Sequence, residues 1–234
     1  VFRQFKGFSY FTEMSDIINR LEDHVASARM KTTPVIDFEK NESLKGLDYL
    51  DTIYHAIVNE HPIQLKYRSF KARSANSFIF YPYLLKEYRN RWFVYGVRGN
   101  GRVLQNLALD RIQSLEVLPQ EHYIKNTFFD PNTFFDDLVG VTKNSGSVAE
   151  KVGFKVAAAE APYIITKPIH RSQQLVERLP DGSVILEIEV VINHELERVF
   201  FGYVDGIEIL YPKTLVELMS RKLEKAAKQY TKSK

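Results

Sequence analysis

The spacing of apolar residues predicts two helices in the first part of the chain. In residues 14–30 apolar side chains recur at helical spacing, and Ser15, followed by Asp16, is in the position of an N-cap. A second helix is expected over residues 46–60, and Pro62 ends it. Its apolar stripe consists of Leu47, Leu50, Ile53, Tyr54 and Ile57.

After Pro62 the apolar pattern alternates, which indicates β-strands. Ile63, Leu65 and Tyr67 are expected to share one face of the first strand. The expected strands cover residues 63–69, 77–85, 91–97, 102–109 and 111–118, with turns at 86–90 and 99–101. Short antiparallel strands joined by tight turns favour a small closed barrel, because closure removes the exposed sheet edges.

Residues 119–147 are expected to connect this first domain to a second one. Asp130 is in the position of an N-cap and Pro131 in the first position of a helix, so a short helix is expected at 130–138. The polar stretch at 142–147 is typical of a loop, and the domain boundary is placed there.

From Val148 onward the pattern predicts strand, helix or turn, strand, strand, helix and strand, which is the order of a ferredoxin-like unit. Asn193 is expected to cap the second of these helices, with Glu195 in its first turn. A last helix begins after Pro212. Its apolar line consists of Leu215, Met219, Leu223, Ala226, Ala227 and Tyr230. The expected fold class is therefore α+β.

Composition narrows the setting of the protein. The chain has 234 residues, of which 44% are hydrophobic and 26% charged, as in globular proteins of one large or two smaller domains. It has no cysteine, so disulfides and cysteine-based zinc sites are excluded and a reducing cytosol is the simplest setting. No apolar run approaches the roughly 18 residues of a membrane helix, and no signal peptide is recognised.

Charge is distributed unevenly along the chain. Residues 45–118 contain eleven Lys and Arg against six Asp and Glu, a balance of +5. Residues 148–211 contain six against ten, a balance of −4, and residues 212–234 contain seven against two, a balance of +5. This asymmetry indicates surfaces with different partners, although uneven scatter of solvated charge explains it equally well.

The stretch Tyr81–Gly96 combines six aromatic rings with Lys86, Arg89 and Arg91. Three interpretations stay open: an aromatic strand pair with a charged turn, a platform for bases and phosphates, or an enzyme pocket. A binding platform would use rings for stacking and cations for phosphates. Trp92 and Phe93 fit a buried core at least as well, and Arg111 could simply pair with Asp110.

Catalytic and metal-binding motifs are weak. His170, Ser172 and Gln173 lie close in sequence but lack a nucleophile elbow and an acidic partner at a defined spacing. His194 and Glu195 resemble part of a metal motif without its second histidine. We therefore expect no enzyme, no metal and no cofactor.

Three segments carry a resemblance to a known family. They are "LKGLDYLDTIYHAIVNEHPIQLKYRSF", "FYPYLLKEYRNRWFVYGV" and "LALDRIQSLEVL", and in this order they resemble the WYL domain. The later segments "KPIHRSQ" and "INHELERVFFGYVDGIEILYP" and the final helix resemble the C-terminal extension that usually follows it. The resemblance covers about residues 44–230 and is closest to WYL regulators of the Bacteroidetes type.

The resemblance implies the effector-sensing and dimerising part of a bacterial transcriptional regulator. It implies an Sm-like or SH3-like barrel that binds single-stranded nucleic acid, with a small anionic effector as the alternative, and a homodimer in the cytosol. Duplex DNA would be bound by a winged helix-turn-helix domain that this chain lacks. The implied division is a helical linker at 1–43, the WYL domain at 44–120, a connector at 121–147 and the extension at 148–234.

The candidate ligand-binding residues follow from the resemblance. They are Tyr67, Arg68, Ser69, Tyr81, Lys86, Tyr88, Arg91, Tyr95 and Arg111. Three positions depart from the family pattern: Phe93 replaces its central tyrosine, Tyr81 a histidine, and Phe78 a basic residue. Because these changes remove polar groups from the expected pocket, we expect a different ligand preference from that of better-known relatives.

Overall fold

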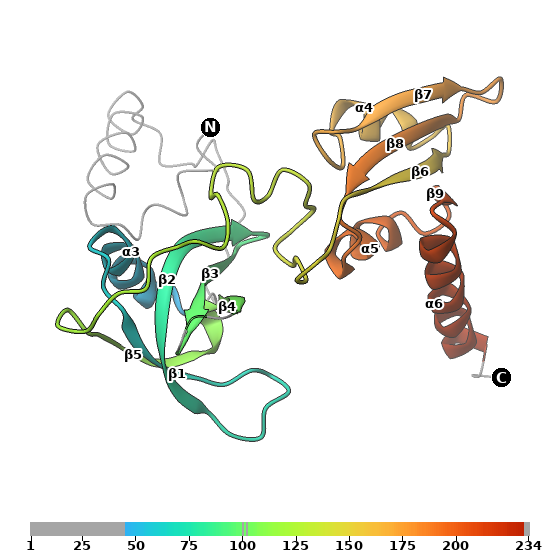
Figure 1. Cartoon of the computed structure of the whole chain (residues 1–234). Coiled ribbons are helices and arrows are strands. Elements are labelled where there is room, and N and C mark those ends of the chain that lie inside the picture. The colour runs from blue at the N-terminus through green and yellow to red at the C-terminus, as the bar shows by residue number, and fades with distance from the viewer. Residues whose placement is uncertain (1–44, 100, 102, 232–234) are drawn as a thin grey trace, which may run out of the picture. The chain divides into compact units, whose positions relative to one another are not determined.

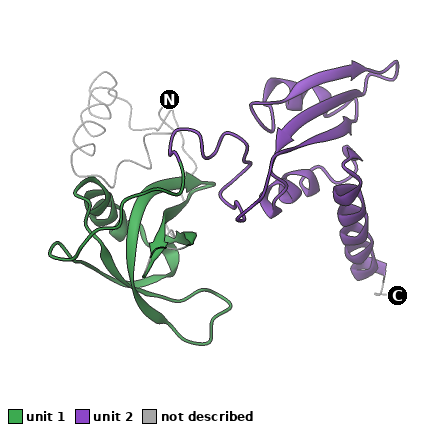
Figure 2. Ribbon diagram, in the orientation of Figure 1, with its two compact units in different colours: residues 1–129 green, residues 130–234 purple. Residues whose placement is uncertain are grey.

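The computed structural model describes residues 45–99, 101 and 103–231. The chain divides into two compact units, one ending at Phe129 and the other spanning Asp130–Lys234 (Figure 2). The helix expected at 14–30 lies outside the described residues.

The first unit is a five-stranded antiparallel sheet with one helix. Its elements are η2 (Leu47–Tyr49), α3 (Leu50–Val58), β1 (Ile63–Tyr67), β2 (Asn76–Tyr88), β3 (Arg91–Arg98), β4 (Leu104–Ala108), η3 (Leu109–Arg111) and β5 (Ile112–Val117) (Figure 1). The five expected strands are confirmed. Their order is β4-β3-β2-β1-β5, so β4 and β5 form opposite edges and do not pair with each other. A closed barrel is therefore not observed among the described strands. Instead η3 joins the two edge strands.

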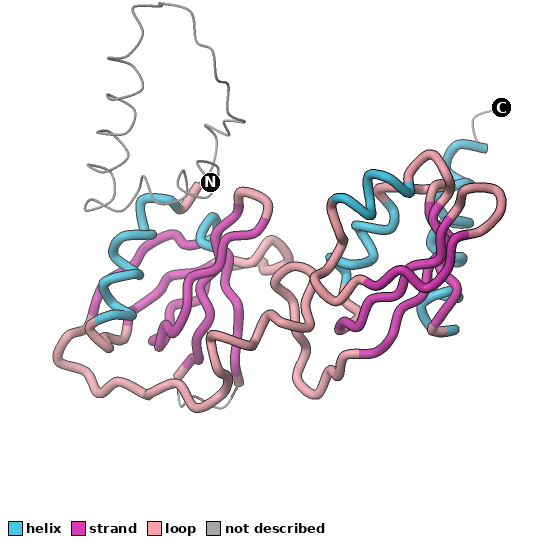
Figure 3. Tube along the Cα trace, turned by 90° about the horizontal axis from the view of Figure 1, so that it is seen from above, coloured by secondary structure: helices cyan, strands magenta, loops and turns pink. Residues whose placement is uncertain are grey.

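Helix α3 packs on one face of this sheet (Figures 1 and 3). Leu50, Ile53 and Ala56 are fully buried and form a core with sheet residues such as Leu65 and Val94. The stripe expected for this helix was partly wrong, because Tyr54 is 42% exposed. The short side chain of Ala56, three residues after Ile53, brings the helix against the sheet in its place.

The β2–β3 hairpin is longer than its sequence pattern suggests. Strand β2 continues to Tyr88, which pairs with Arg91, so the turn contains only Arg89 and Asn90. Their φ angles are 50° and 62°. Positive φ at both central residues matches the twist of two-residue hairpins, and the charged segment 86–90 is therefore mostly strand.

The short helix expected at 130–138 is wrong. Residues 131–137 form successive turns. The side chain of Asp130 does accept from the backbone N–H of Asn132, as a turn-initiating residue would, at 2.9 Å. The turns do not continue as a helix, because later bonds such as Leu138 N–H to Phe135 O span only three residues.

The second unit is a four-stranded antiparallel sheet with three helices. Its elements are β6 (Glu150–Val156), α4 (Ala161–Thr166), β7 (Gln174–Arg178), β8 (Val184–Val190), α5 (His194–Phe201), β9 (Ile207–Tyr211) and α6 (Lys213–Thr231). The expected order of strands and helices is confirmed, and the strands are arranged β7-β8-β6-β9. The ferredoxin-like classification itself stays a prediction.

All three helices of this unit contribute to one core. Its buried residues include Phe154 of β6, Ile164 of α4, Phe200 of α5 and Met219 of α6. The cap expected at Asn193 is confirmed, because its side-chain oxygen accepts from the Leu196 N–H at 2.9 Å. The apolar line expected along α6 holds only for its first half, where Leu215 and Met219 are buried. Leu223 and Tyr230 are exposed, so the second half was wrong.

Candidate nucleic-acid interface

The corner of the first sheet at η3 brings two arginines to one carboxylate. Residues on both sides of η3, Ala108 and Ile112, have extended backbones, so the three-residue turn presents Asp110 and Arg111 between strands. Arg91, at the start of β3, places Nε 3.3 Å from Oδ2 of Asp110. Arg111 places Nε 3.8 Å from Oδ1 of the same carboxylate. Two positive charges on one negative charge leave this corner cationic.

Tyr67 and Phe70 flank Arg111. The half-buried Tyr67 ends β1, and burial raises the pKa of its hydroxyl while the neighbouring Arg111 opposes that shift. The guanidinium of Arg111 lies 4.4 Å from the ring centroid of Phe70, in cation–π geometry. Phe70 is nevertheless 74% exposed. An exposed ring above an arginine is the pair of groups that a nucleotide needs, one for its base and one for its phosphate.

Two polar atoms at this corner are not satisfied by hydrogen bonds. Oδ1 of Asp110 and Nε of Arg111 are buried and have no hydrogen-bond partner in the described part of the chain. A buried polar group without a partner costs roughly 1–3 kcal/mol. These two atoms face each other at 3.8 Å, so charge attraction and not a hydrogen bond holds the pair.

The loop between β1 and β2, residues 68–75, extends the cationic surface. Arg68, Lys71 and Arg73 are exposed, and no acidic residue occurs between Arg68 and Glu87. The backbone N–H of Arg68 donates to the carbonyl of Arg111 at 3.1 Å, which fixes the loop to the corner. Sequence reasoning missed Phe70, Lys71 and Arg73, although the two cations lie close to Arg68 in the sequence.

The structure brings together only part of the predicted site. Tyr67, Arg68, Arg91 and Arg111 meet at the η3 corner through the contacts above, and the pairing of Tyr88 with Arg91 places Tyr88 beside it. Ser69 lies in the adjoining loop, where its carbonyl accepts from Ala72 N–H. Lys86 lies two residues before Tyr88 in β2, where it pairs with Phe93 of β3.

Tyr81 and Tyr95 do not join this corner. Tyr95 is 3% exposed and its ring lies 6.3 Å from that of Phe129. The ring of Tyr81 lies 6.1 Å from that of Tyr123, whose hydroxyl donates to the carbonyl of Pro82. Residues after β5 thus cover this aromatic surface, which sequence reasoning could not foresee because Tyr123 and Phe129 are distant in the chain.

Two neighbouring aromatic residues, Tyr83 and Trp92, pack against other side chains of the first unit. Tyr83 is buried between Tyr123 and Phe128, and burial raises the pKa of its hydroxyl to about 12. Trp92 packs against the core that contains Val94, in agreement with the interpretation of this ring as a core residue.

The weaker motifs show no catalytic arrangement. His170 is buried, and its Nδ1 lies 2.7 Å from Oγ of Ser172, which in turn bonds to the backbone of Glu189. His194 Nε2 lies 3.2 Å from Oε1 of Glu195. Within the described ranges, no three His, Asp or Glu side chains are grouped so as to hold a metal ion. Over the same residues, no helix is both long and apolar enough to cross a membrane.

Comparison with known domains agrees with this architecture. Residues 48–117 match the WYL domain, and residues 149–227 match the WCX domain. The chain therefore belongs to the WYL-domain proteins and carries a WCX domain after its WYL domain. No curated protein matches the chain significantly in sequence.

Two solved structures illustrate the wider similarity. Proteasome accessory factor B/C (PafBC) of Arthrobacter aurescens is 16% identical with a TM-score of 0.37, and the match covers 87% of this chain and 30% of that one. A CRISPR Cas-related protein is 12% identical with a TM-score of 0.47, covering 80% of this chain and 52% of that one. The chain thus spans only about a third and a half of their respective lengths.

Proposed function

We propose that this chain is the effector-sensing part of a bacterial transcriptional regulator. In this proposal the WYL domain binds a single-stranded nucleic acid, and binding changes how a separate helix-turn-helix domain engages duplex DNA. The protein acts as a homodimer in the cytosol, with no catalysis and no cofactor. A ligand can switch such a regulator only if its affinity differs between two arrangements of the protein.

One observation carries the choice of ligand: the exposed ring of Phe70 lies over Arg111 beside a second arginine, Arg91. Arginines alone would accept any anion. The ring adds a stacking surface, which is worth roughly 1–3 kcal/mol per base. The exposed cations of loop 68–75 continue the positive surface, as expected for a chain of phosphates.

The second candidate is a small anionic effector in place of the nucleic acid. It is favoured by the two partly exposed arginines that share one carboxylate, because a single carboxylate or phosphate could bind both guanidinium groups. Native mass spectrometry of the purified protein separates the two, because a small effector would add one discrete mass of a few hundred daltons at most.

The direct test is fluorescence anisotropy with a labelled eight-nucleotide oligo-dT between 50 and 200 mM salt. We expect Arg111→Ala to weaken binding at least about tenfold and to reduce the salt slope by about 0.7, the value for one phosphate contact on a single strand. Arg178→Ala is the matched control, since Arg178 is an exposed arginine of β7 in the other unit. Absence of binding at 50 mM salt to oligo-dT and to mixed-sequence DNA or RNA strands would remove the nucleic-acid proposal.

A further inference from the structure

The C-terminal half of α6 lies outside the core of the second unit. Leu215 and Met219 anchor the first half of the helix. From Arg221 to Thr231 every residue is exposed. The side chains of this half therefore face solvent and take no part in the core. Helical segments of this length are marginally stable without packing.

Cations on this half differ in whether they have an acidic partner. Lys222 pairs with Glu197, and Lys213 in the first half lies 3.6 Å from Glu217. Arg221 and Lys225 have no ion pair with any of the described residues. No side chain of the described residues therefore neutralises these two charges.

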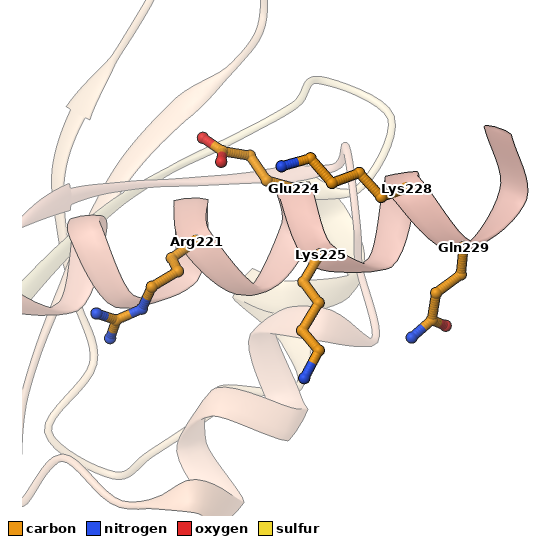
Figure 4. A pocket seen from close by; sticks show the side chains of 5 residues that line it. All are labelled: Arg221, Glu224, Lys225, Lys228 and Gln229. Carbon is orange, nitrogen blue, oxygen red and sulfur yellow. The ribbon is translucent and has the colours of Figure 1, made fainter. Parts of the chain in front are cut away.

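Arg221 and Lys225 contribute to one open hollow. Figure 4 shows Arg221, Lys225 and Gln229 extending to the same side of the helix, while Glu224 and Lys228 extend to the other. All five residues, the acid Glu224 included, line one open space of about 480 Å³ on the helix surface. The side formed by Arg221, Lys225 and Gln229, which we name the α6 donor face, offers two cations and an amide that can donate hydrogen bonds.

The α6 donor face fits a phosphate backbone. Arg221 and Lys225 are one helical turn apart, which separates them by about 6 Å along the helix axis. This is close to the rise of two nucleotides along one strand of duplex DNA, at about 3.4 Å each. No aromatic ring accompanies them, because Tyr230 is about two and a half turns from Arg221 and so lies on the opposite side. Phosphate contact without base stacking suits a duplex better than a single strand.

Other partners fit this face less well. A membrane-surface helix needs a broad apolar face, but only Leu223 and Tyr230 are large exposed apolar residues here. A second copy of the chain would have to offer free acids. Three acids of the second unit are already bound within it: Asp181 by Lys155, Asp136 by Arg171 and Glu187 by Lys151. Others, such as Glu150 and Glu177, are exposed, so dimerisation is included as an outcome of the test.

We propose that the α6 donor face binds the phosphate backbone of duplex nucleic acid without sequence preference. This site is separate from the sensing site proposed on the WYL domain. It would hold the second unit against the duplex wherever a regulator of this kind is bound.

The test compares two double variants with a labelled 20-base-pair duplex across 50–200 mM salt. Arg221→Gln with Lys225→Gln should lower the affinity at 50 mM salt at least about tenfold and reduce the salt slope by about 2, which corresponds to two lost phosphate contacts. Lys167→Gln with Arg178→Gln removes the same charge from other exposed positions of this unit and should leave the slope unchanged.

Each outcome decides one proposal. Unchanged duplex binding in the Arg221/Lys225 variant, or an equal loss in both variants, overturns the α6 inference. So does a loss of binding to anionic lipid vesicles, or of dimer in sedimentation, while duplex binding is kept. The eight-nucleotide oligo-dT reports on the WYL site, so its binding should be unaffected by the α6 variant and weakened at least about tenfold in Arg111→Ala.

Discussion

Asp110 is the residue that sets the charge of the candidate interface. It is the counter-ion of both Arg91 and Arg111. Asp110→Asn should strengthen oligo-dT binding by about threefold to tenfold at 50 mM salt, because the arginines lose the attraction that competes with phosphate. The same change should lower the free energy of unfolding by about 1 kcal/mol, since two partly exposed ion pairs are lost.

The control for this prediction is Glu116→Gln. Glu116 is an exposed acid of β5 in the same unit, so the substitution makes the same change in net charge. Equal strengthening in both variants would mean that overall charge, not the η3 corner, governs binding. Weaker binding in Asp110→Asn would show that the carboxylate positions the arginines for the ligand.

Gly153 is required by a tyrosine that lies across it. A Cβ at this position would stand 2.1 Å from Cζ of Tyr211. The Tyr211 hydroxyl donates to Oε2 of Glu187 at 2.7 Å, while Lys151 donates to Oε1 at 2.8 Å, and these two bonds lower the pKa of Glu187. Tyr211 therefore has a fixed position on the face of the sheet opposite the core.

Gly153→Ala should reduce the free energy of unfolding by about 1–3 kcal/mol, the usual cost of overpacking. In the background of Tyr211→Ala the same substitution should cost much less, because the clashing ring is gone. Urea unfolding of the four proteins of this double-mutant cycle measures the coupling. Additive effects would show that Tyr211 moves aside freely.

At the scale of single residues, the sequence predicted functions that depend on neighbours in the chain. Asn193 caps a helix three residues away, so its role could be read locally. The position of Phe70 over Arg111 depends on a loop folding back across forty residues, and no local pattern encodes it. For the same reason the sequence could not show that Tyr95 is buried, with the ring of Phe129 from a distant segment 6.3 Å away.

At the scale of elements, the β2–β3 turn offers a direct prediction. Arg89 and Asn90 both have positive φ, which glycine and asparagine adopt more readily than arginine. Replacing Arg89→Asn and Asn90→Gly should raise the free energy of unfolding by about 0.5–1 kcal/mol. The cation–π contact of Arg89 with Tyr88, at 5.5 Å, is lost but is exposed and contributes little. A midpoint temperature of thermal unfolding that stays unchanged or falls would contradict this account of the hairpin.

Elements with strong periodicity were predicted well, and those with weak periodicity were not. Alternation fixed all five strands of the first sheet because one face of each is buried. The segment 130–138 has helix-starting residues but no apolar stripe to pack, and it forms turns. In α6 the apolar line runs past the end of the core, so periodicity alone could not tell that Leu223 and Tyr230 are exposed.

At the scale of the whole molecule, the two compact units should respond differently to acid. His170 is buried in the second unit, and burial lowers the pKa of its imidazole, with Arg171 acting in the same direction. Asp136 and Asp137 oppose the shift without cancelling it. The folded state therefore holds this histidine neutral at pH values where the unfolded chain already binds a proton.

The sign of the pH effect follows from that difference. A lowered pKa in the folded state means that stability is complete above about pH 6.5, the unfolded value, and is lost as pH falls through the folded value. Differential scanning calorimetry at pH 7.5 and 5.5 should show the transition of the second unit moving to lower temperature on acidification.

His170→Asn keeps a neutral side chain at both pH values and should reduce that movement. His122→Gln, a substitution at an exposed position of the first unit, should leave the acid-induced shift of the second unit's transition temperature unchanged. An acid shift of equal size in His170→Asn would show that other groups of the second unit cause it.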